Sequence, residues 1–321
     1  MDDSPIQTAL CVIGHPIGGN PTQFVAARAL ASLGLDWQFL SFDVEPSKIQ
    51  AAISGIDSLG FCGAMIAEPY QADVARYVAE YRGEFVNEKL SETWYDFLVR
   101  NEKKELVLNN LCAEALTQIV QMHETAIGNS LLECLLIGDA SKLKAVIKPF
   151  SPSLPVVRSV IIGSRVVLWN SDSDIDATPE NAKPQDAKPQ DFESREASLG
   201  EETKPLVVAK IVNQPPPLLI LWAADAKPGK KNASKSPALS PAADYLIEHI
   251  AALHPQSLCV DLTGTARSWF STARSIESPP ITIVDKVELD VRRLAIAIQL
   301  WTSLQPNLDA MREAIEEYLE V

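Results

Sequence analysis

The sequence ALCVIGHPIGG at residues 9–19 joins a short apolar run to a turn rich in glycine and proline. An apolar run that stops at Gly14 is typical of a buried strand. Thr22 follows the turn, and we expect it to cap a helix that runs to about Leu33 and stops at Gly34. This stretch therefore predicts a strand followed directly by a helix.

The same alternation continues along the chain. We expect further strands at 37–44, 61–66, 105–108, 131–137, 165–169, 218–222, 258–261 and 281–284. We expect further helices at 47–56, 70–81, 113–124, 289–304 and 307–319. Asn307 is the expected cap of the last helix. Strands that alternate with helices form parallel βαβ units, so the sequence predicts an α/β fold.

Composition excludes several classes of partner. The 321 residues are 46% hydrophobic and carry a formal net charge of -14, which argues against nucleic acid and against anionic lipid surfaces. No apolar run reaches the length of a membrane span, and the first ten residues lack the pattern of a signal peptide. The five cysteines show no CxxC spacing and the four histidines no metal-ligand spacing. We expect a cytoplasmic protein without a bound metal.

Residues 171–205 differ in composition from the rest of the chain. They are acidic, contain prolines and repeat AKPQD at 182–186 and 187–191. Such a segment cannot bury enough apolar surface to offset its ordering entropy, so we expect it to be disordered. It is a candidate docking segment for a protein partner.

The run VIGHPIGG at residues 12–19 resembles the N-terminal signature of the shikimate dehydrogenase family, in which a strand enters a G-N-P-I turn. Four more stretches match that family in order: LGLDW at 33–37, FDVEP at 42–46, LGFCG at 59–63 and IQLWT at 298–302, the last similar to F-E-L-W-T-G. The resemblance implies a two-domain fold. A substrate domain at 1–110 would include the closing helices at 289–321, and a Rossmann-like nucleotide domain at 111–288 would contain the insertion.

The family reaction belongs to aromatic amino acid biosynthesis. It reduces 3-dehydroshikimate to shikimate with NADPH, in the cleft between the domains, so the resemblance implies an oxidoreductase with NADP as cofactor. Hydride transfer to a ketone also needs a proton donor near the developing alkoxide. The family uses the lysine of N-V-T-x-P-x-K and the aspartate of N-T-D-G. Gln71 and Cys112 stand at these two catalytic positions, and a glutamine cannot deliver a proton.

Substrate-contact positions are altered as well. The S-x-S motif falls on Asn20 and Thr22, and the asparagine and threonine of N-V-T fall on Met65 and Ala67. Asn110 keeps the asparagine of N-T-D-G. An asparagine, a glutamine and a tyrosine of other motifs become Asp96, Arg293 and Gly264. A site that discriminates through hydrogen bonds to several hydroxyls loses recognition when those partners are lost.

The cofactor loop departs from the family in the same way. Its G-A-G-G-A becomes GDASK at 138–142, and its N-R-T becomes Asn170-Ser171-Asp172. The residues matched to cofactor contacts are Gly138, Ala140, Ser141 and Asn170. One glycine remains where several allow close approach to a pyrophosphate, and no arginine is placed for the 2′-phosphate.

The residues leave two functional hypotheses open. The first is a family member without catalysis, re-purposed to bind a ligand or a protein. The second is an active NADP-dependent oxidoreductase for shikimate or a related hydroxy acid, with a rearranged site. Arg293 would either hold a small carboxylate ligand or pair with an acidic neighbour such as Asp96.

Two substitute catalytic groups are also conceivable. Tyr70 with Glu68 could replace the missing acid, although an ordinary surface role is the simpler interpretation. Cys112 could act as a nucleophile with His123, eleven residues further along a helix, if a base lay close enough.

Overall fold

The protein is described by a computed structural model of the 321-residue chain. The residues that it describes are 7–67, 69–83, 94–128, 131, 133–138, 156–162, 165–168, 218–223, 254–267, 270 and 281–320. The segment at 171–205, for which disorder was expected, lies outside these ranges. Within them, no helix is long and apolar enough to cross a bilayer.

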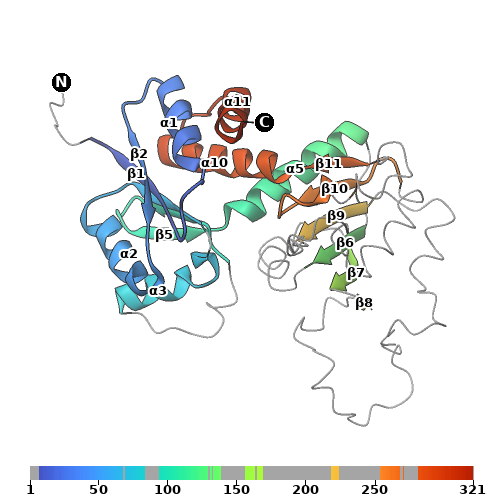
Figure 1. Ribbon diagram of the computed structural model, residues 1–321, viewed down its shortest axis with the longest axis horizontal. Helices are drawn as coiled ribbons and strands as arrows, with labels where there is room; N and C mark the ends of the chain where they lie inside the picture. Colours follow the sequence, from blue (N-terminus) through green and yellow to red (C-terminus); the bar gives the residue numbers. More distant parts are fainter. Residues whose placement is uncertain are drawn as a thin grey trace, which may run out of the picture. The chain divides into compact units, whose positions relative to one another are not determined.

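The described residues fall into two compact units. The first contains residues up to Leu116 and from Val287 onward, and the second contains residues between Thr117 and Lys286. Each unit is built around one sheet (Figure 1). The expected α/β class with a Rossmann-like second unit, and with the closing helices packed in the first, is confirmed.

The first unit holds a five-stranded sheet in the order β2-β1-β3-β4-β5. Its strands are β1 (Ala9–Gly14), β2 (Gln38–Asp43), β3 (Gly63–Ile66), β4 (Phe97–Arg100) and β5 (Leu106–Asn109). Strand β1 runs parallel to β2 and β3, whereas β4 is antiparallel to both of its neighbours. The sequence reading missed β4, which is separated by three residues from the undescribed segment 84–93.

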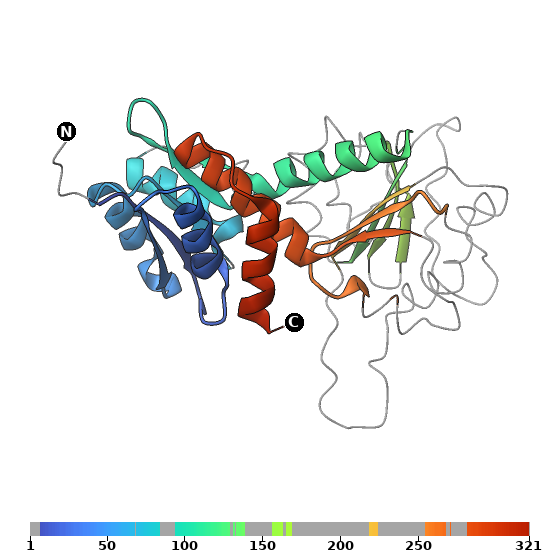
Figure 2. The ribbon, with the colours of Figure 1, turned by 90° about the horizontal axis from the view of Figure 1, so that it is seen from above.

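Helices cover both faces of this sheet (Figures 1 and 2). Helices α2 (Ile49–Ser58) and α3 (Val74–Arg82) lie on one face, and their apolar side chains join those of the strands in one core. Helices α1 (Thr22–Ser32), α10 (Lys286–Thr302) and α11 (Leu308–Leu319) lie on the other. Short 3₁₀ turns, η1 (Pro46–Lys48) and η2 (Tyr70–Ala72), precede α2 and α3, and α5 (Leu111–Ile127) follows β5.

The two expected helix caps have different outcomes. Asn307 caps α11, because its Oδ1 accepts hydrogen bonds from Asp309 N at 2.9 Å and Ala310 N at 3.2 Å. The capping role given to Thr22 is wrong. Helix α1 begins at Thr22 itself, and the Thr22 amide donates to Oδ1 of Asn20 at 2.9 Å.

The second unit holds a six-stranded sheet in the order β11-β10-β9-β6-β7-β8. Its strands are β6 (Glu133–Gly138), β7 (Val156–Ile162), β8 (Arg165–Leu168), β9 (Leu218–Ala223), β10 (Leu258–Asp261) and β11 (Thr282–Val284). Read from β6, this is the 3-2-1-4-5-6 order of a dinucleotide-binding fold. All neighbours are parallel except β7 and β8.

Strand β6 lies between two parallel neighbours, β9 and β7, and the sequence reading missed β7. The predicted strand at 165–169 exists as β8, but it is the antiparallel edge strand. Asn170, which was matched to the N-R-T motif, lies outside the described residues. A Gly-Ser pair between two β-branched runs, at 163–164, is a hairpin signal that could have revealed β7.

Trp301, in the W-T pair of the C-terminal motif, packs against aromatic residues of the first sheet. The Trp301 ring of α10 lies 4.9 Å from the Phe97 ring and 6.0 Å from the Phe39 ring, centroid to centroid. Its Nε1 faces Leu98 O at 3.4 Å, directly over Gly63. Gly63 has no side chain, and this allows α10 to approach the sheet.

We therefore predict that Gly63→Ala destabilises the protein by about 2–3 kcal/mol through overpacking. An added Cβ would lie 2.2 Å from Leu98 O and 2.4 Å from Trp301 Nε1. Urea unfolding of the full chain measures the loss. The matched control is Gly55→Ala in α2, where a Cβ meets no atom within 4 Å and where stability should rise by about 0.5–1 kcal/mol. Equal effects of the two substitutions would contradict this packing role.

Candidate functional site

The residues matched to catalytic and substrate positions gather in the first unit. Gln71 lies in η2 after β3, and Asp96 directly precedes β4. Asn110 and Cys112 stand at the start of α5, and Arg293 lies on α10. Contacts between these side chains show which of them remain available to a ligand.

Asp96 is the most buried ionisable group of this set, with no exposed surface. Its Oδ1 accepts from the Leu111 amide at 2.7 Å, and its Oδ2 accepts from the Cys112 amide at 3.1 Å. Oδ2 also accepts from Nε and Nη2 of Arg293, at 2.9 and 2.8 Å. The carboxylate therefore caps the N-terminus of α5 and neutralises a cation from α10 at the same time.

Arg293 makes an ion pair with acidic neighbours in the same unit. Besides Asp96, its Nη1 donates to Asp290 Oδ1 at 2.9 Å, and its guanidinium lies 5.9 Å from the centroid of the Trp94 ring. Its side chain is 13% exposed. Burial opposes the charge, but Asp96 and then Asp290 outweigh it and raise the pKa of Arg293 above its usual range. Of the two alternatives for Arg293, pairing with Asp96 is confirmed.

Gln71 is held in place by hydrogen bonds to backbone groups of neighbouring residues. Its side chain is 5% exposed, and Nε2 donates to Ile66 O at 3.0 Å. The Gln71 carbonyl accepts from the Tyr95 amide at 2.9 Å, next to Asp96. The side chain thus links the end of β3 to η2. Because an amide has no proton to release near neutral pH, this position supplies no acid.

Cys112 and Asn110 belong to the start of α5. Cys112 is buried, and its backbone amide donates to Asp96. Asn110 Oδ1 accepts from the Ala113 amide at 2.9 Å, and its Nδ2 donates to Trp94 O at 2.8 Å. His123, the conceivable base for Cys112, has Nε2 at 2.8 Å from Gln256 O. Asn110 is therefore a helix cap, and His123 is engaged with a backbone carbonyl.

The remaining matched positions also make structural contacts. Met65 is buried in β3 opposite Phe97 of β4, and Oδ1 of Asn20 accepts from the Thr22 amide at the start of α1. Tyr70 is 3% exposed, so the surface role expected for it is wrong. Its hydroxyl donates to Val44 O, and burial is the main cause that raises its phenol pKa.

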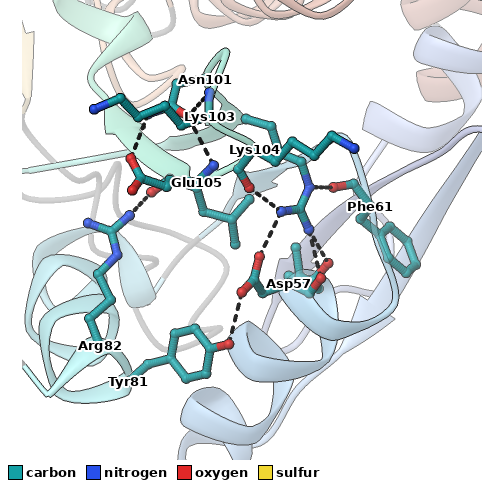
Figure 3. A network of polar contacts seen from close by, with 11 residues as sticks. Asp57, Phe61, Tyr81, Arg82, Asn101, Lys103, Lys104 and Glu105 are labelled. Atoms are coloured by element: carbon teal, nitrogen blue, oxygen red, sulfur yellow. Dashed lines mark hydrogen bonds and ion pairs between the residues drawn. The ribbon is translucent and has the colours of Figure 1, made fainter.

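A second polar network fixes the β4–β5 hairpin that carries Asp96. Arg100, the last residue of β4, uses all five of its N–H donors (Figure 3). Nε donates to Phe61 O at 2.6 Å, and Nη1 donates to Asp57 Oδ1 at 2.7 Å and Lys104 O at 2.6 Å. Nη2 donates to Ile56 O at 3.2 Å and Asp57 O at 2.8 Å. One side chain therefore ties the hairpin to the C-terminal end of α2.

Neighbouring side chains complete this network (Figure 3). Tyr81 donates to Asp57 Oδ2 at 2.9 Å, and Arg82 donates to Leu106 O on β5. Burial opposes the Asp57 charge, but bonds from Arg100 and Tyr81 lower the pKa of its carboxyl below the usual value. Sequence reasoning missed this network, since no spacing rule connects a helix end at 57 with a strand end at 100.

Cofactor positions are only partly described. Gly138 is the last residue of β6 and pairs with Ala223 of β9, at the centre of the second sheet. Ala140 and Ser141 lie outside the described residues. On β10, the buried Asp261 side chain accepts from the amides of Thr263, Gly264 and Ala266 and so organises its own loop. Within the described part of the chain, no group of three or more His, Cys, Asp or Glu side chains is placed to hold a metal.

Comparisons with known proteins agree with this architecture. A model of the shikimate dehydrogenase substrate binding domain matches residues 12–85. The shikimate dehydrogenase (NADP(+)) of Methanothermobacter thermautotrophicus is 32% identical over 72 residues, 22% of this chain and 25% of that protein. The Bacillus subtilis enzyme is 21% identical over 306 residues, which cover 95% of both chains. Residues 12–85 are thus similar to the substrate binding domain of shikimate dehydrogenases, and the chain as a whole is similar to a shikimate dehydrogenase along nearly its full length.

The fold extends over the whole family enzyme. The chain superposes on the structure of shikimate 5-dehydrogenase from Thermus thermophilus in complex with shikimate with a TM-score of 0.59 and 17% sequence identity. The superposition covers 98% of this chain and 100% of that one. Compared with the family's motifs, the chain carries an acid at position 96 and a cation at position 293, and these two bind each other. Cys112 and Gln71 remain the predicted counterparts of the family's catalytic aspartate and lysine.

The Arg100 network generates a stability prediction. Arg100→Lys keeps the charge but offers three donors without the planar fork, so it should lower the free energy of unfolding by about 2–3 kcal/mol. The matched control is Arg76→Lys on α3, where the guanidinium meets Asp73 and Glu80 at the surface, both at 3.3 Å. That change should stay within about 0.5 kcal/mol. Denaturant unfolding decides, and a loss at Arg100 as small as at Arg76 would refute the network's role.

Proposed function

We propose that this protein is a shikimate dehydrogenase-like protein that no longer transfers hydride to 3-dehydroshikimate and functions by binding. The observation that carries the proposal is the Asp96–Arg293 ion pair. It joins the two positions at which the family's asparagine and glutamine were matched to substrate contacts. Polar groups that bind each other are not available for the hydroxyls of a substrate.

The proton balance supports the same conclusion. Reduction of a ketone by NADPH needs a proton at the oxygen that becomes the alcohol. Gln71 has none to give, and Arg293 holds its proton more tightly than a free arginine. Cys112 is buried with its amide on Asp96. None of these three side chains is suited to replace the family's lysine and aspartate.

A second candidate is an active NADP-dependent oxidoreductase with a rearranged site. It is favoured by the match to the Bacillus subtilis enzyme along 95% of both chains. The strand order of the second unit and the glycine at the end of β6 are compatible with a dinucleotide. Under this candidate the chain would bind NADP and act on shikimate or a related hydroxy acid.

Under the first candidate, the natural ligand is a small molecule or a protein. On this proposal Arg293 is not the anchor for a small carboxylate, because Asp96 and Asp290 take one donor from each of its three nitrogens and balance its charge. A protein partner would have residues 171–205 as its candidate docking segment, on the composition of that segment alone.

Shikimate oxidation separates the two candidates. We expect no NADPH formation by the purified chain with saturating shikimate and NADP+ across neutral to alkaline pH, measured by absorbance. The Bacillus subtilis enzyme serves as the positive control. The double variant Gln71→Lys with Cys112→Asp restores both residues of the family motifs. It tests whether the absence of these two residues is enough to explain a lack of shikimate oxidation. Turnover by the unmodified chain above the enzyme-free rate would sink the proposal and favour the second candidate.

A further inference from the structure

Four hydrogen-bond donors converge on one point of the first unit. They are the backbone amides of Leu111 and Cys112 at the N-terminus of α5, and Nε and Nη2 of Arg293. All four lie between 2.7 and 3.1 Å from the oxygens of Asp96. A helix N-terminus combined with a guanidinium is a favourable environment for a carboxylate.

Burial makes this arrangement selective. Asp96 has no exposed surface and the Arg293 side chain is 13% exposed, so water contributes little to the solvation of either charge. A guanidinium in such a place is costly without an anion beside it. Any group that replaced the Asp96 carboxylate would have to bring a negative charge and fit roughly the space that the carboxyl group leaves, as formate and acetate do.

We infer that these donors form a carboxylate seat whose occupant is the chain's own Asp96. The side chain excludes external acids from the wild-type seat, and shortening it opens the seat to small carboxylates such as formate and acetate. This inference concerns ligand exclusion, and it holds whether or not the chain oxidises shikimate. It also explains why an arginine can stand at position 293 without recruiting a carboxylate ligand.

The test is chemical rescue of Asp96→Ala in the full-length chain. Removing the carboxylate should lower Tm by on the order of 10 °C, because Arg293 is left without its main partner. Replacing chloride with about 100 mM acetate or formate at equal ionic strength should return roughly 3–6 °C. Benzoate, which is too large for the seat, should return nothing, and the wild type should respond to none of the three salts.

Two further variants keep the result interpretable. Asp96→Ser retains a hydroxyl that can cap α5, so we expect it to be more stable than the alanine variant and to gain stability in formate, the smaller of the two acids. Asp57→Ala is the matched control, since Asp57 also pairs with an arginine, at 2.7 Å, but its side chain is 31% exposed. It should show no acetate gain. If neither Asp96 variant is more stable in formate or acetate than in chloride, or if Asp57→Ala gains as much, Asp96 is only a helix cap and the inference is overturned.

Discussion

The first unit depends on the contacts that the Asp96 carboxylate makes with the start of α5 and with Arg293 of α10. A buried anion is tolerated only if several donors replace its water shell. The Asp96 carboxylate accepts hydrogen bonds from two backbone amides of α5 and from a guanidinium of α10. One side chain therefore joins the β4–β5 hairpin to α5 and to α10. The Arg100 network holds the far end of the same hairpin. Position and charge at residue 96 therefore constrain three elements at once.

The chain keeps a shikimate dehydrogenase-like fold, whereas we propose that it has lost the chemistry of those enzymes. Gly63 and Trp301 allow the close approach of α10 to the sheet. Gln71 and Cys112 are the residues that we matched to the family's catalytic lysine and aspartate, and a buried acid and cation pair with each other at Asp96 and Arg293. An arginine cannot act as a proton donor in this setting, and on our proposal the Asp96–Arg293 ion pair contributes stability and takes no part in acid catalysis.

Local pattern was enough to predict most of the fold. The strand at 9–14 and the cap at Asn307 follow from apolar runs and capping rules, which act over a few residues. The direction of β8 and the existence of β7 did not follow, because pairing partners are set by tertiary contacts. At the site, the pairing of Arg293 with Asp96 was one of two stated alternatives. The Arg100 network, which spans 43 residues between Asp57 and Arg100, had no sequence signal.

A crystal structure of the full-length protein grown with saturating shikimate and NADP+ tests the central claim most directly. We expect Nε and Nη2 of Arg293 to remain within about 3 Å of Asp96 Oδ2. We also expect that no shikimate lies against Gln71, Asp96 or Arg293. Shikimate bound at these residues, with Arg293 turned from Asp96 toward the ligand, would contradict the account. The position would then be a working substrate site, and the chain would have to be regarded as a family enzyme with altered contacts.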